Sequence, residues 1–280
     1  MRMACFDGLP LHLDAGGAVL LLGRQSSRDW LEHFSEGVDV RVAGDSRGIR
    51  VEGLDPNGSH DELTAAARDY ANRALDLMAV RSIGSYALAD QTSPFIWWGG
   101  APNTTIRIVS ETNTTFSLTI GGLPNPAQSA WHESMRYFRM SQTTTDLFDA
   151  FRNLYLALES ILSTIAPVRL GPRGRPAEGE SAWTRRALGE AAHVLQAHNS
   201  GLTFDRYLGT PSTGDPVSAV FDNLYRGVRS SVFHAKNGRV FALTQNHLDR
   251  EQIADALERY VILYTDLVEP VLGVRFLRSG

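Results

Sequence analysis

The sequence predicts an α+β N-terminal domain followed by an all-α helical bundle. Two observations predict it. Residues 1–125 alternate short β-branched segments with Gly, Asp and Asn turns, whereas from Gln128 onward apolar residues recur at helical spacing. The chain has 280 residues, which is long enough for two hydrophobic cores of ordinary size. We therefore expect a small α+β domain over residues 1–125 and a helical bundle over residues 126–280.

In the N-terminal half, segments of strand character surround one clear helix. The helix is expected over residues 60–80, because Ser59 and Glu62 form a capping-box pattern and apolar residues then follow at helical spacing. Strand character is found in residues 38–42, 49–51, 105–109 and 115–120. No motif for catalysis or ligand binding lies in this half, so its role stays open.

The C-terminal half contains five segments in which apolar residues recur every three or four positions. They predict helices over residues 131–140, 147–165, 182–197, 216–235 and 249–272. The first two are joined by so short a turn that they should pack antiparallel. Between the second and third, residues 168–180 are rich in Gly, Pro and Arg and are expected to form an exposed loop.

Composition argues against several classes of protein. The apolar run at residues 18–22 is far shorter than the ~20 residues of a membrane-spanning helix, and no basic segment of a secretory signal precedes it. Cys5 is the only cysteine, which excludes an internal disulfide and a cysteine-based zinc site. No phosphate-binding or dinucleotide-binding glycine motif occurs. We expect a cytoplasmic protein with no cofactor, no metal and no membrane contact.

The charge distribution weakly favours a polyanionic partner. The net charge is -4, which argues against general nucleic-acid binding. Locally, residues 168–186 hold five arginines against two glutamates, a net of +3, and residues 222–239 hold four basic residues against one aspartate, also +3. Of the 27 basic residues only Lys236 is a lysine, and because codon usage in a GC-rich genome explains this better than phosphate binding does, the arginines alone say little about phosphate recognition. Solvated surface charges remain the alternative for both segments.

Arg229 and His234 are the candidate catalytic pair, near the end of the fourth predicted helix. Metal-free cleavage of RNA needs a group that takes the 2′-hydroxyl proton and another that protonates the leaving oxygen, and a histidine can do either near neutral pH. An arginine can clamp the phosphate as negative charge builds. On an ideal helix residues five apart lie roughly 140° apart, so the arginine side chain or the helix end must bring the two together. Ser230, four residues before His234, shares its face and could assist.

The motif Arg229-x4-His234, before a last long helix, resembles the Arg-x4-6-His motif of the HEPN superfamily. Two other pairs also fit the Arg-x4-6-His pattern, Arg28 to His33 and Arg186 to His193, so placement rather than pattern selects Arg229 and His234. Residues 137–140 and 146–160 resemble the first helical pair of ApeA-like and methylamine-utilisation (MauJ-like) HEPN proteins. The resemblance covers about half the chain. In the family the residue after the motif arginine is commonly Asn, Asp or His, whereas it is Ser230 here.

This resemblance implies a homodimer that cuts RNA to a cyclic phosphate, in stress or phage defence. Arg229, His234 and Ser230 would be catalytic, with Arg226, Lys236 and Arg239 as substrate-binding residues. It also hints that a polar group such as Glu159 faces the site, although an ordinary exposed glutamate fits equally. Three alternatives stay open. Arg229 and His234 could have structural roles as an ion pair and a helix cap, the domain could be a non-catalytic dimeric binding or assembly module, or the protein could be an accessory in amine metabolism.

Overall fold

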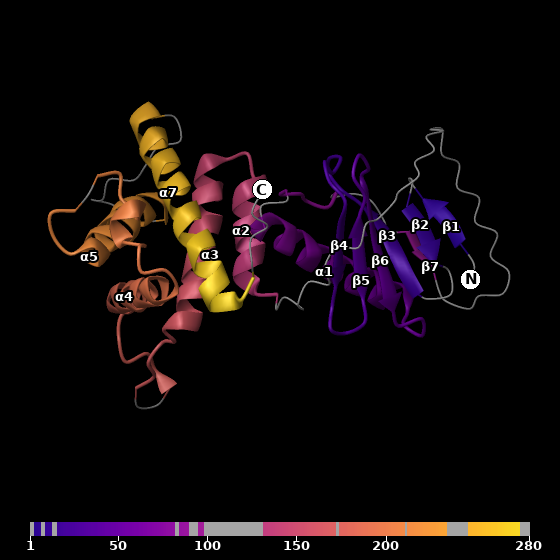
Figure 1. Ribbon diagram of the computed structural model, residues 1–280, viewed down its shortest axis with the longest axis horizontal. Helices are drawn as coiled ribbons and strands as arrows, with labels where there is room; N and C mark the ends of the chain where they lie inside the picture. The colour runs from indigo at the N-terminus through magenta and orange to yellow at the C-terminus, as the bar shows by residue number, and fades with distance from the viewer. Residues whose placement is uncertain are drawn as a thin grey trace. The chain divides into compact units, whose positions relative to one another are not determined.

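The computed structural model describes residues 3–6, 9–12, 16–81, 84–89, 95–97, 131–171, 174–210, 212–233 and 246–274. The chain divides into two compact units, Met1–Ser129 and Ala130–Gly280. The N-terminal unit combines a sheet with one long helix, and the described elements of the C-terminal unit are helices (Figure 1). An α+β chain is therefore confirmed.

The N-terminal unit contains an antiparallel sheet of five strands (Figure 1). Their order is β4 (Trp30–His33), β5 (Asp39–Val42), β6 (Gly48–Leu54), β3 (Gly16–Leu21) and β7 (Phe95–Trp97). A separate antiparallel pair is formed by β1 (Met3–Phe6) and β2 (Leu9–His12). The strand predictions at 38–42 and 49–51 are confirmed by β5 and β6. Those at 105–109 and 115–120 lie outside the described residues.

The sheet and the single long helix share one hydrophobic core. Cross-strand pairs set Val40 opposite Val51 and Val42 opposite Ile49, and all four side chains are fully buried. The helix α1 (His60–Val80) packs against β3, β5 and β6 and contributes Leu63, Ala67, Ala71, Ala74, Leu75 and Met78 to this core. Apolar area removed from water on both surfaces stabilises this unit.

The start of α1 has the capping box that its sequence predicts. The Ser59 side chain accepts a hydrogen bond from the backbone of Glu62, and the Glu62 carboxylate accepts one from the backbone of Ser59. Both bonds satisfy N–H groups that a helix start leaves unpaired. The prediction of a helix over 60–80 is confirmed to the residue.

The helices of the C-terminal unit surround a core of aromatic and aliphatic side chains. They are α2 (Glu133–Thr143), α3 (Leu147–Ile165), α4 (Glu180–His198), the 3-10 turn η2 (Phe204–Tyr207), α5 (Pro216–Phe221), η3 (Asp222–Arg229), α6 (Ser230–Phe233) and α7 (His247–Leu272). Helix α3 packs against α2, α4 and α7, and its Phe151, Leu154 and Ile161 are fully buried. Helix α3 therefore lies at the centre of this unit (Figure 1).

The fourth predicted helix is wrong in type. Residues 216–235 were expected to form one α-helix, but Asp222–Arg229 form a π-helix, η3, between the short helices α5 and α6. Gly227 lowers the local α-helical preference, and the Ser230 hydroxyl donates to the Tyr225 carbonyl, 3.0 Å away and five residues earlier. The Phe221 and Tyr225 rings, four residues apart, stack with centroids 5.3 Å apart at the start of this stretch.

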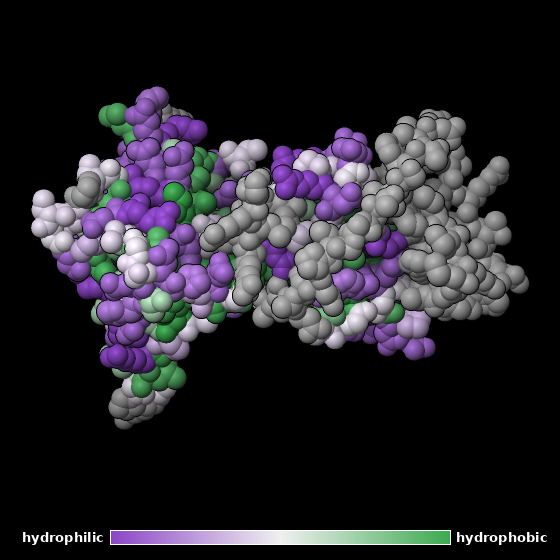
Figure 2. Space-filling view, viewed as in Figure 1, coloured by the Kyte–Doolittle hydropathy of each residue, from purple (hydrophilic) through white to green (hydrophobic). Residues whose placement is uncertain are grey.

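The surface of the helical unit is mainly hydrophilic on the face seen in Figure 2, with apolar patches between the polar side chains. Among the described residues, the large apolar side chains that stay exposed are Met140, Val168, Leu170, Leu248 and Ile262. None of the helices in the described ranges has the length and apolar content needed to cross a lipid bilayer.

Candidate functional site

The π-helix places Arg229 in an enclosed position. Its side chain is only 13% exposed, and its guanidinium Nη2 lies 2.5 Å from Oε1 of Glu180, in the first turn of α4. Three aromatic rings surround the guanidinium carbon, with centroids at 4.9 Å (Tyr225), 5.6 Å (Tyr155) and 5.6 Å (Phe233). A cation held by a carboxylate and three ring faces is strongly fixed in place.

Two carboxylates act on this arginine, one from α4 and one from α3. Burial raises the pKa of Glu159, repulsion from Glu180 raises it further, and attraction by Arg229 lowers it. The pKa values of the two tyrosines beside the guanidinium, Tyr155 and Tyr225, are also raised. Burial is the main cause of the raised pKa of Tyr155 and of Tyr225, and the nearby carboxylate of Glu180 raises the pKa of Tyr225 further. Two carboxylates and one guanidinium thus share a partly desolvated cluster.

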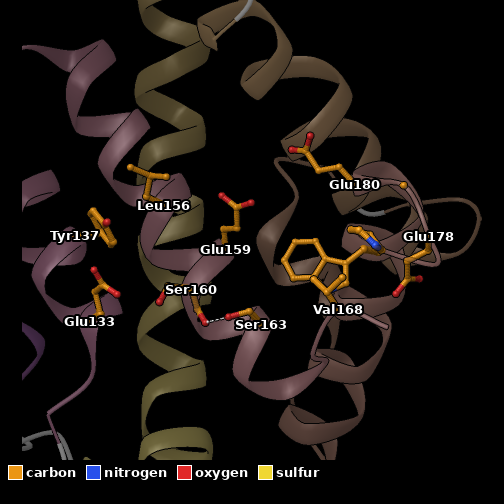
Figure 3. A pocket seen from close by; sticks show the side chains of 12 residues that line it. Glu133, Tyr137, Leu156, Glu159, Ser160, Ser163, Val168, Glu178 and Glu180 are labelled. Atoms are coloured by element: carbon orange, nitrogen blue, oxygen red, sulfur yellow. Dashed lines mark hydrogen bonds between the residues drawn. The ribbon is translucent and has the colours of Figure 1, made fainter. Parts of the chain in front are cut away.

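A pocket of about 660 Å³ opens beside this cluster, between α2, α3, the start of α4 and the loop that precedes α4. Figure 3 shows Glu159 and Glu180 directed into the gap between α3 and α4, while Glu133 and Tyr137 approach from α2. The lining residues are Glu133, Tyr137, Leu156, Glu159, Ser160, Ser163, Val168, Pro176, Glu178, Gly179, Glu180 and Trp183. Four are glutamates, and none of these described lining residues is basic.

The aromatic wall of the pocket is anchored by Trp183. Its indole Nε1 donates to the backbone carbonyl of Ala166 at 2.8 Å, and its side chain is 5% exposed. The loop between Ala166 and α4 is held by Arg186, whose guanidinium forms an ion pair with Glu178 and donates to the Pro167 carbonyl at 3.1 Å. This fixes the pocket's outer wall to α4.

The structure places three of the six predicted site residues. Arg229 is enclosed as described, and the hydroxyl of Ser230 is engaged with the backbone of Tyr225. Arg226 is 64% exposed, lies 3.2 Å from Asp222 and extends over the Phe221 ring. Its contacts are therefore with residues about one turn earlier in the same helical stretch. His234, Lys236 and Arg239 lie outside the described residues.

Sequence reasoning missed Glu180, Tyr155 and Trp183 as members of this site. Glu180 and Arg229 are 49 residues apart, and the packing of α4 against α5, which leads directly into η3, brings them together. Glu159 was singled out by its place on the second helix, four residues after Tyr155. Periodicity identifies Tyr155 as a core residue, and nothing in its spacing shows that its ring faces a guanidinium.

Comparisons with known proteins leave the site to be interpreted from its own geometry. No family model, no curated protein and no solved structure matches the chain. Within the described ranges, no group of three or more His, Cys, Asp or Glu side chains is placed to hold a metal ion. The fold and site define a helical domain with an open, acidic and partly apolar pocket next to an enclosed arginine.

Proposed function

We propose that the C-terminal unit is a binding module, and that its ligand occupies the pocket between α2, α3 and α4. The observation that carries this proposal is the pocket itself. Its volume of about 660 Å³ lies in the range of small-molecule sites, and apolar walls are combined with a few convergent polar groups. In keeping with the resemblance, we take the unit to be an HEPN-like bundle that works as a homodimer. The α2–α3 pair and the long final helix α7 support the bundle, and the homodimer follows from the resemblance alone.

The surroundings of Arg229 favour binding over RNA cleavage. A phosphate clamp needs a guanidinium that can turn to its substrate, but Arg229 donates to Glu180 and is enclosed by three rings. The adjoining pocket is lined by four glutamates, which repel a polyanion. A ligand other than RNA fits this charge better.

A pocket-filling substitution tests the binding proposal. Ser160 lines the pocket, and a phenylalanine there would occupy its volume. We would screen a panel of small amines, acids, alcohols and peptides against the full chain by ligand-observed NMR. Ser160→Phe should abolish the binding of every true ligand. Ser200→Phe, in an exposed turn after α4, is the matched control and should leave binding intact. Ligands that bind Ser160→Phe unchanged would remove the pocket from the function.

An endoribonuclease is the second candidate, and one observation favours it. The π-helix η3 ends at Arg229 and is followed directly by Ser230, on the path to His234. Stretches of π-helix occur frequently at functional sites. In this mechanism His234 would be the acid and base, Arg229 the phosphate clamp and Ser230 an orienting group. Arg226, Lys236 and Arg239 would contact the RNA backbone, and the N-terminal unit would sense a trigger or position substrate.

The ribonuclease candidate makes a demand that the binding module does not. Arg229 would have to exchange Glu180 for phosphate, so removing the Glu180 charge should increase cleavage. We would incubate labelled RNA in EDTA with the wild-type chain, Glu180→Gln and His234→Ala. Cleavage that rises in the first variant and vanishes in the second would establish the enzyme. Equal cleavage by wild type and His234→Ala would exclude His234 from any mechanism. The neighbouring genes would separate a role in phage defence from a role in amine metabolism, because adjacent dehydrogenase genes would favour metabolism.

A further inference from the structure

Of the four carboxylates that line the pocket, two have a basic partner among the described residues. Glu178 is paired with Arg186, and Glu180 is paired with Arg229. Within the described part of the chain, Glu133 and Glu159 have no ion-pair partner. The pocket therefore carries two carboxylates in excess, one on α2 and one on α3, and both point into it (Figure 3).

Between the carboxylates the pocket wall is apolar and aromatic. Leu156, Val168 and Pro176 supply aliphatic surface, and Tyr137 and Trp183 supply rings. The indole N–H of Trp183 already donates to Ala166, so a ligand meets the ring's carbon surface and not its donor. Such a ring face attracts a cation, and the aliphatic wall favours a hydrocarbon body.

Taken together, the unbalanced carboxylates and the hydrocarbon wall point to one class of ligand. We propose that the pocket binds an organic cation, an amine with an aliphatic or aromatic body whose ammonium group lies between Glu159 and Glu133. The hydroxyl-bearing Ser160, also on the lining, can accept a further hydrogen bond from the ammonium. This inference rests on the proposed function, because it assigns a chemistry to the same pocket.

The electrostatics of Glu159 agree with this chemistry. Its pKa is raised by burial and by Glu180, so its ionised form lacks a full counter-charge in the ligand-free chain. A bound ammonium supplies that charge. It therefore lowers the pKa of Glu159 and favours release of the carboxyl proton. Binding of an amine should therefore release protons at mildly acidic pH, and a neutral ligand should not.

Three probes of matched shape and different charge test the inference. Isothermal titration calorimetry on the full chain would compare 2-phenylethylamine, 2-phenylethanol and 3-phenylpropanoate at neutral pH. We expect the amine to bind best. Glu159→Gln should weaken the amine about tenfold and leave the alcohol unchanged, because a charge-assisted hydrogen bond is lost. Glu190→Gln, an exposed glutamate on α4 outside the lining, is the control and should have no effect.

The outcomes separate the ligand class from the pocket's function. If the alcohol or the propanoate binds as tightly as the amine and Ser160→Phe abolishes that binding, the cation inference is wrong while the binding module stands. If Glu159→Gln and wild type bind the amine equally, the assigned carboxylate is wrong. If no probe binds, the inference is overturned, and the proposed function then depends on the wider ligand panel alone.

Discussion

The guanidinium of Arg229 and the carboxylate of Glu180 form a 2.5 Å ion pair between the end of a π-helix and the first turn of α4. The arginine is nearly enclosed, whereas the carboxylate is 44% exposed and also lines the pocket. One residue of this pair is therefore a packing element, and the other is accessible to a ligand.

The first prediction concerns how much Arg229 contributes to the stability of the fold. Arg229→Gln leaves Glu180 without its partner and removes a cation from three aromatic rings, so we expect a loss of about 1–3 kcal/mol in the free energy of unfolding. Arg226→Gln is the control. It breaks only an exposed pair on one helix and should change stability by less than about 0.5 kcal/mol. Urea unfolding of both variants decides the matter, and similar losses would show that Arg229 is an ordinary surface arginine.

The second prediction is a pH dependence that originates at Glu159. Because its pKa is raised in the folded chain, the folded state binds more protons than the unfolded state between the two pKa values. Stability therefore falls as pH rises through that window, and the full penalty is present at neutral pH. Glu159→Gln removes it and should stabilise the chain by about 0.5 kcal/mol at neutral pH. Below the ordinary glutamate pKa of 4.5 the gain over wild type should vanish.

The measurement for Glu159 is a series of thermal unfolding curves across acidic and neutral pH. Glu190→Gln serves as the control, since this exposed side chain lies outside the pocket lining. A stabilisation that is independent of pH would contradict the electrostatic explanation and would indicate a packing effect of the amide.

The third prediction is in the N-terminal unit, where Arg81 and Glu32 form a buried ion pair. The two side chains lie 2.8 Å apart and are 6% and 2% exposed. Burial raises the pKa of Glu32 despite the attraction of Arg81. Arg81→Met should cost about 3–5 kcal/mol, because it leaves a carboxylate buried without its counter-charge. Arg73→Met, which removes a partly exposed ion pair with Glu36, should cost clearly less in the same denaturation assay. The reverse order would be inconsistent with this assignment.

The fourth prediction compares two glycines with left-handed backbone conformation. Gly37 and Gly53 have φ angles of 81° and 86°. A Cβ at Gly37 would meet nothing within 4 Å, whereas at Gly53 it would lie 2.3 Å from the Gly37 carbonyl oxygen. Gly37→Ala should cost about 1–2 kcal/mol from backbone strain alone. Gly53→Ala adds a steric clash at the irregularity between β3 and β6, so its loss in thermal stability should be clearly larger. Equal losses would rule out the clash.

The sequence predicts those elements whose burial follows a simple period. Helix α1 has a capping box and one apolar face, and its predicted range is correct. Strand β4 was missed because its inward positions hold Trp30 and Glu32, and the partner that allows a carboxylate to be buried, Arg81, lies 49 residues later. Strand β3 was missed because Ala18, Val19 and Leu20 are all buried, which removes the alternation that marks a strand.

The candidate site was predicted only in part. The motif directs attention to Arg229 and Ser230, and the second helix to Glu159. The counter-charge of Arg229 depends on how α4 packs against α5, and the spacing of residues along the sequence does not predict that contact. The π-helix was not predicted either, because the apolar residues of 216–235 recur at ordinary α-helical spacing and the bond from Ser230 to the Tyr225 carbonyl is visible only in the structure.

Glu180 both lines the pocket and pairs with Arg229. A cationic ligand and the Arg229 guanidinium would therefore compete for the same carboxylate. An ammonium that reaches Glu180 competes with the guanidinium for the charge of that carboxylate, which weakens the contact between η3 and α4. By thermodynamic reciprocity, whatever loosens the arginine strengthens the ligand, and the ligand loosens the arginine to the same degree. A ligand that engages Glu180 would thus act on η3 as well as on the pocket.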